Sequence, residues 1–159
     1  MDPPLTVLYR DHRLVAVDKP PGLLVHRSRL SGDGHFLVQR LRDQLGQWVY
    51  PVHRLDRATS GAMVFALDPE GAGRLGAAFM AGAVAKTYQA VVRGWPPPEG
   101  RVSHPLDDPE SGRGRRPAVT RYRTLATVEL PIPVDRYPAA RYALVEARPE
   151  TGRRHQVRR

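Results

Sequence analysis

The chain has 159 residues, 41% of them hydrophobic, which is enough to bury the core of one ordinary globular domain. It has no cysteine, so disulfides, thiolate metal sites and cysteine nucleophiles are excluded, and no apolar run approaches the roughly 20 residues of a membrane span. The formal net charge of +9 favours a polyanionic partner such as a nucleic acid, although a compositional bias toward arginine would give the same charge. Because Met1 opens no secretory signal pattern, we expect a cytoplasmic protein.

The first predicted elements are two strands and a helix. Runs rich in apolar and β-branched residues at 5–10 and 14–19 are separated by a polar triplet and predict a β-hairpin. A helix is then expected from Asp33, a suitable capping residue. In that helix Leu37, Leu41 and Leu45 recur every four residues and would share one face packed on the core.

The rest of the chain alternates strand and loop signals around a second helix. The unbroken apolar run at 62–67 predicts a buried strand, and Asp68 with Pro69 provides the start of a helix. A stretch at 95–116, rich in proline, glycine and charge, is interpreted as a long surface loop. Three more strands are expected, at 86–92, 119–130 and 141–147. This pattern predicts an α+β domain with a mixed, mainly antiparallel sheet flanked by helices.

The segment from His53 to Gly61, with the sequence HRLDRATSG, places one carboxylate between two arginines. We expect residues 50–55 to form a strand, from which Arg54 and Asp56 project to the same side. A cation at that distance favours the ionised carboxylate, which is the form that nucleophilic attack requires. For an arginine and an aspartate at this spacing taken alone, an ordinary salt bridge at a strand end is the favoured interpretation.

Two further segments carry side chains that could take part in catalysis or in RNA binding. Tyr88 follows Lys86 on the same face of a predicted strand, where it is either a half-buried core residue or a group that stacks on a base or moves a proton. The last residues, 151–159, predict a short helix on which Arg154 and Arg158 share a face. These arginines either contact RNA phosphates or include one that turns inward to pair with Asp56. No residue pattern predicts a metal site or a phosphate loop.

Four segments occur in the order and spacing of the RluA-type pseudouridine synthases, namely 17–26, 53–61, 86–88 and 151–158. The chain resembles this family over nearly its whole length. The resemblance implies an RNA pseudouridine synthase, an isomerase that converts uridine to pseudouridine and needs no cofactor. Within the family, the variant residues resemble the members that act on uridine 65 of tRNA. A synthase acting on 23S rRNA with the same chemistry, or an inactive RNA-binding fragment, stays open as an alternative.

The resemblance also assigns roles to individual residues. It implies that Asp56 is the nucleophile, that Tyr88 packs against the target base, that Arg158 pairs with Asp56, and that Arg54 helps to extrude the uridine. The residues expected on RNA phosphates are Arg57, Arg115, Arg116, Arg153 and Arg154, together with Arg113.

The extent of the chain leads to a last expectation. Relatives continue beyond residue 159, so we expect residues 1–159 to be a catalytic domain that is incomplete at its C-terminus and that lacks a separate N-terminal RNA-binding domain. We expect a monomer whose partner is RNA, most of all tRNA, with no membrane contact.

Overall fold

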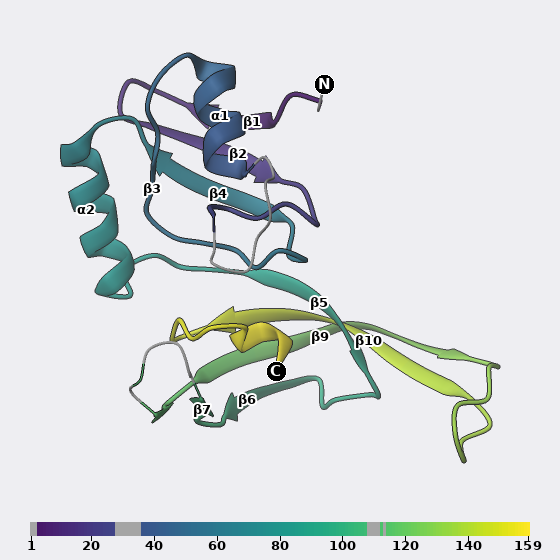
Figure 1. Ribbon diagram of the computed structural model, residues 1–159. Helices are drawn as coiled ribbons and strands as arrows, with labels where there is room; N and C mark the ends of the chain where they lie inside the picture. Colours follow the sequence, from purple (N-terminus) through teal and green to yellow (C-terminus); the bar gives the residue numbers. More distant parts are fainter. Residues whose placement is uncertain (1–2, 28–35, 108–111, 113) are drawn as a thin grey trace. The chain divides into compact units, whose positions relative to one another are not determined.

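The computed structural model describes residues 3–27, 36–107, 112 and 114–159, and divides into two compact units (Figure 1). The N-terminal unit comprises residues 1–83 and the C-terminal unit residues 84–159. Every pairing between described strands is antiparallel. The expected α+β class, with antiparallel sheets and two α-helices, is confirmed.

A four-stranded sheet with the order β1-β2-β4-β3 forms the N-terminal unit. The expected hairpin of β1 and β2 is present, and the Asp11 carboxylate accepts the backbone N–H groups of Arg13 and Leu14 in its turn. The elements are β1 (Thr6–Arg10), β2 (Leu14–Lys19), α1 (Leu37–Leu45), β3 (Tyr50–Pro51), β4 (Gly61–Ala66) and α2 (Pro69–Met80).

Apolar side chains of β2, β4 and α1 make much of the core of this unit. Helix α1 buries Leu37 and Leu41, as the periodicity predicted, while Leu45 is half-buried. The helix begins later than expected, with Phe36 as its N-cap, and Asp33 lies outside the described residues. Helix α2 begins as expected, because the Asp68 carboxylate accepts the Gly71 N–H at 2.7 Å.

The strand expected over residues 50–55 is wrong in its length, because β3 ends at Pro51. Proline has no N–H with which to continue the ladder, so the chain leaves β4 at this point. The segment that follows, which contains Asp56, is therefore a turn rather than the end of a strand. This turn makes up most of the connection between β3 and β4.

A second four-stranded sheet, with the order β5-β10-β9-β6, forms the C-terminal unit. The interpretation of 95–116 as an irregular loop was wrong, since β6 pairs with β9. Gly100 permits this pairing, because a Cβ there would lie 2.6 Å from the Tyr122 phenol oxygen. The elements are β5 (Tyr88–Arg93), β6 (Glu99–Ser103), β7 (Leu106–Asp107), β8 (Arg115–Arg116), β9 (Val119–Leu130), β10 (Ala140–Pro149) and the 3-10 helix η1 (Gln156–Arg158).

The two faces of this sheet differ in character. Ala143, Val145 and Ala147 of β10 are buried, and the register places Tyr88 and Tyr122 opposite Ala147 on the same face. The other face carries charged residues from three adjacent strands, with Arg101 opposite Arg121 and Arg121 opposite Arg148. The sheet therefore has one largely apolar face, which includes Tyr88, and one face rich in arginine.

Candidate active site

Asp56 lies in the turn that follows β3, half-buried, and its carbonyl accepts the Thr59 N–H at 3.1 Å. Arg54, which was expected to project to the same side of a strand as Asp56, is exposed. The early end of β3 removes the basis of that expectation, because the alternation that would place the two side chains together holds only within a strand. The role of Arg54 in extruding uridine stays a prediction.

One cation that the structure brings to this turn is Lys19, the last residue of β2. Its side chain has no exposed surface, and its Nζ donates to the carbonyls of Pro20 and Leu23, both at 2.8 Å, and of Arg57 at 3.2 Å. Burial lowers the pKa of Lys19, whereas the negative charge of Asp56 acts in the opposite direction and raises it. Lys19 thus anchors the turn at the Arg57 carbonyl, and its positive charge interacts with the negative charge of Asp56.

Sequence analysis missed Lys19 as a site residue, although the pattern contained a signal. Val15, Val17 and Lys19 occupy alternate positions of one strand, and all three are fully buried. A lysine on the buried face of a strand must satisfy its ammonium inside the protein, since burial of an unpaired charge is strongly unfavourable. Such a residue marks a place where backbone carbonyls converge, which here are those of Pro20 and Leu23 after β2 and of Arg57 next to Asp56.

Two further hydrogen bonds connect the loop after β2 with the turn that contains Asp56. The Gly22 N–H donates to the Arg57 carbonyl at 2.8 Å, and the Arg57 Nε donates to the Gly22 carbonyl at 3.0 Å. Gly22 has a φ of 84°, a conformation that glycine adopts without strain. Part of the Arg57 guanidinium is therefore used within the protein, and its proposed phosphate contact would involve the remaining, exposed donors.

The other expected site residues belong to the C-terminal unit. Tyr88 begins β5 and is half-buried, and Arg158 ends η1, where it is exposed. The expected helix for Arg154 and Arg158 does not include Arg154: the 3-10 helix η1 begins only at Gln156, because His155 before it has a left-handed backbone with φ of 56°. The predicted pairing of Arg158 with Asp56 stays a prediction.

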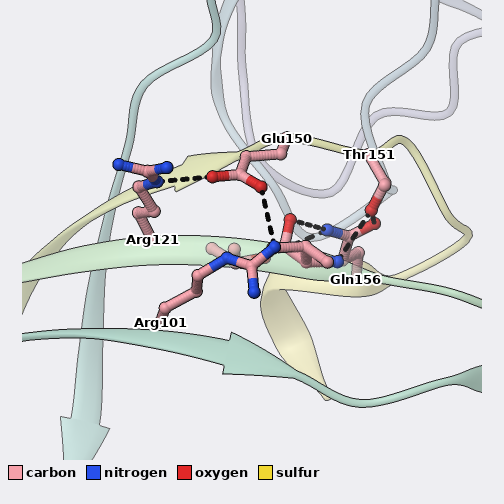
Figure 2. A network of polar contacts seen from close by, with 7 residues as sticks. Arg101, Arg121, Glu150, Thr151 and Gln156 are labelled. Carbon is pink, nitrogen blue, oxygen red and sulfur yellow. Dashed lines mark hydrogen bonds and ion pairs between the residues drawn. The ribbon is translucent and has the colours of Figure 1, made fainter.

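Gln156 fixes the turn that precedes Arg158 (Figure 2). Its Oε1 accepts from the Thr151 hydroxyl and the Arg153 N–H, both at 2.9 Å, and its Nε2 donates to the Val119 carbonyl at 2.9 Å and to the Thr120 hydroxyl at 3.0 Å. The Val119 N–H donates in turn to the Thr151 hydroxyl at 2.9 Å. This amide therefore satisfies all four of its usual hydrogen-bonding positions and joins the turn to the start of β9.

The arginines expected on RNA are partly engaged with the protein. Arg115 pairs with Asp107 at 3.7 Å, Arg153 donates to the Pro117 carbonyl at 2.8 Å, and Arg116 is half-buried in β8. Arg154 is also half-buried, and Arg113 lies outside the described residues. Their contacts with phosphate stay predictions.

The arginine-rich sheet face was not anticipated. Glu150 binds both Arg101 and Arg121, as Figure 2 shows, and these bonds, with that from Arg121 the largest influence, lower the pKa of Glu150. Glu146 similarly pairs with Arg123 at 3.6 Å and Arg148 at 2.9 Å. Four arginines thus share two carboxylates on this face.

Two other features are absent from the described part of the chain. It contains no group of three or more histidine, cysteine, aspartate or glutamate side chains that could hold a metal ion. Within the same residues, no helix is long and apolar enough to cross a membrane.

Comparison with known proteins gives consistent matches. The family described as RNA pseudouridylate synthase matches residues 13–159. The chain is 46% identical to tRNA pseudouridine synthase C of Pectobacterium carotovorum subsp. carotovorum, over 98% of this chain and 44% of that protein. Proteins of the same name from Salmonella typhimurium and Pasteurella multocida are 46% and 47% identical over 98% of this chain, which covers 64% and 68% of their lengths.

Solved structures give the same result. The fold is similar to that of human RNA Pseudouridylate Synthase Domain Containing 4, with a TM-score of 0.75 and 28% identity over 96% of this chain and 62% of that one. Human RNA Pseudouridylate Synthase Domain Containing 1 also has a TM-score of 0.75, with 26% identity over 99% of this chain and 66% of that one. The chain spans less than two-thirds of the length of several of these relatives. It belongs to the RNA pseudouridylate synthase family.

Proposed function

We propose that the protein isomerises uridine to pseudouridine in tRNA, at uridine 65. The observation that carries the proposal is the identity of 46% or more, over 98% of the chain, to proteins named tRNA pseudouridine synthase C. The braced position of Asp56 supports it, because a nucleophile must be held in one place before the substrate arrives. A tRNA substrate would place the protein in the cytoplasm.

The reaction needs access to atoms that a base-paired uridine hides. The nucleotide must therefore leave its stack, at a cost of a few kcal/mol that phosphate contacts offset. Asp56 then attacks C1′ or C6 of the uridine, or removes a proton on a path through a glycal. The N1–C1′ bond breaks, the base turns, and a C5–C1′ bond forms. The C5 proton leaves and N1 gains one, so no electrons are exchanged and no oxidant or reductant is required.

Side chains of both units have roles in this proposal. Tyr88 packs against the flipped base, Arg158 pairs with Asp56, and Arg54 helps to extrude the uridine. In the N-terminal unit, Lys19 adds a positive charge near Asp56 and keeps its turn in place. The RNA backbone is bound by arginines, which agrees with the net charge of +9.

The test is to incubate the purified protein with total RNA that lacks pseudouridine and to map the new pseudouridines by position. We expect one modified position in tRNA, at uridine 65. Modification of 23S rRNA instead would support the alternative synthase, while RNA binding with no modification of any RNA would show a binding module and overturn the proposal.

A further inference from the structure

The sheet of the N-terminal unit ends in an unusual way beside the Asp56 turn. Strands β3 and β4 pair through Tyr50 with Ala66 and Pro51 with Phe65, and the ladder then stops. The next residue along β4 is Val64, and its backbone N–H donates to Nε2 of His53 at 3.0 Å. The imidazole therefore occupies the place of the backbone carbonyl that a longer β3 would have supplied.

A second contact fixes the orientation of the same ring. His53 stacks on Phe79 of α2 with the ring centroids 4.5 Å apart and the planes inclined by 17°. Nε2 can accept a hydrogen bond only in the neutral imidazole, with the proton on Nδ1. His53 is thus held between a strand and a helix, in one tautomer and one orientation.

The position of His53 gives this contact a consequence for catalysis. His53 precedes Asp56 by three residues, which span at most about 10 Å of chain. On the other side of Asp56, the turn is anchored at the Arg57 carbonyl by Lys19 and Gly22. Movement at His53 would therefore pass directly into Asp56, while the opposite end of the turn stayed in place.

We propose that His53 is a positioning residue for Asp56, and that it acts through the hydrogen bond from Val64 rather than through contact with the substrate. The inference rests on the proposed function, because it gives Asp56 the role of nucleophile. A misplacement of about 1 Å at a reacting group can lower a rate by about 100-fold. Without the hydrogen bond from Val64 to His53, the turn would be poorly ordered and Asp56 would be misplaced for catalysis.

Two substitutions test separately the hydrogen-bond acceptor and the aromatic stack that the His53 imidazole provides. His53→Gln keeps an acceptor, since Oε1 lies near the position of Nε2, but loses the aromatic stack. His53→Phe keeps the stack on Phe79 but leaves the Val64 N–H without its acceptor. The measurements are kcat and KM on the unmodified tRNA transcript that the wild type modifies, hydrogen exchange of the Val64 amide, and thermal melting.

We expect His53→Phe to lower kcat by about 10- to 100-fold with KM within about 3-fold of wild type, and to expose the Val64 amide to exchange. His53→Gln should restore most of kcat and the protection of that amide. If His53→Phe does not fold, His53→Leu replaces it, because leucine also lacks an acceptor and is smaller.

Three results would overturn the inference. The first is an active wild type with kcat unchanged in a folded variant that has no acceptor. The second is a rise in KM alone, which would indicate contact with RNA. The third is the failure of both acceptor-free variants to fold while His53→Gln is fully active, which would make the bond a requirement of the fold. A wild type that modifies no RNA would instead remove the proposed function itself.

Discussion

The turn that carries Asp56 and the turn that carries Arg158 are anchored by different chemistry. In the N-terminal unit, residues 53–59 are anchored at the Arg57 carbonyl by the fully buried ammonium of Lys19, which also binds the carbonyls of Pro20 and Leu23. In the C-terminal unit, residues 151–158 are held by the neutral amide of Gln156, which makes four hydrogen bonds. A buried charge must be compensated completely, whereas an amide can lose one bond at modest cost. The Asp56 turn should therefore respond to substitution more sharply.

The largest effect is expected from Lys19→Met, which keeps the length of the side chain and removes its charge and donors. The carbonyls of Pro20 and Leu23 would lose the ammonium, and the Arg57 carbonyl would keep only the bond from the Gly22 N–H, so the free energy of unfolding should fall by about 3 kcal/mol. Activity should fall further than stability explains, because Asp56 loses a nearby cation. Chemical denaturation and kcat measure the two effects, with Arg10→Met on exposed β1 as the control. Equal behaviour of the two variants would contradict the anchoring role of Lys19.

The difference in stability between wild type and Lys19→Met should depend on pH. Burial lowers the pKa of Lys19 in the folded protein below its ordinary value of 10.5, so between the two values the unfolded chain binds more protons. The stability that wild type has relative to Lys19→Met should therefore rise as the pH increases from the lowered value toward 10.5. Denaturation at a series of alkaline pH values measures this difference. A difference that falls over that range would mean that burial does not dominate at Lys19.

A smaller effect is expected from Gln156→Leu in the second turn. The substitution removes bonds to Thr151, Arg153, Val119 and Thr120, which should reduce the free energy of unfolding by about 1–2 kcal/mol. Activity should fall because Arg158 is then less well placed. Gln89→Leu, at an exposed position of β5, is the matched control. If Gln156→Leu destabilised the protein more than Lys19→Met, Gln156 rather than Lys19 would contribute more to stability, which would contradict the comparison.

The smallest effect is expected from Glu150→Gln on the exposed arginine-rich face. Arg121 and Arg101 lower the pKa of Glu150, so the ionised carboxylate stabilises the fold above its ordinary value of 4.5, and this contribution is lost as the pH falls through the lowered value. The variant should melt slightly below wild type at neutral pH and together with it in stronger acid. Glu99→Gln on β6 is the control. A gap between the melting temperatures that persists in strong acid would show that the ion pairs are not its cause.

The parts of the molecule that sequence reasoning predicted are those that local patterns determine. The β-rich run of β2, the shared buried face of Leu37 and Leu41 in α1 and the Asp68–Pro69 start of α2 each depend on a few neighbouring residues, and each of these features was confirmed. The family resemblance was also confirmed, and it depends on motifs whose order and spacing can be read directly.

The parts that could not be predicted depend on contacts between distant segments. Lys19 lies 38 residues from Arg57, whose carbonyl it binds, and His53 lies 11 residues from Val64. The left-handed backbone at His155, which delays the start of η1 to Gln156, has no clear residue signal because glycine stands earlier, at Gly152. The partners of such residues depend on which backbone groups the tertiary structure leaves without a hydrogen bond nearby.

The role of Asp56 as nucleophile is tested most directly by Asp56→Asn, which preserves the size of the side chain and removes its charge. The measurements are single-turnover formation of pseudouridine in a tRNA transcript and, in parallel, the affinity of the protein for that transcript. We expect product formation to be abolished while the dissociation constant stays within a few-fold of wild type, because the phosphate contacts are unchanged. Product formation near the wild-type rate would contradict the assignment.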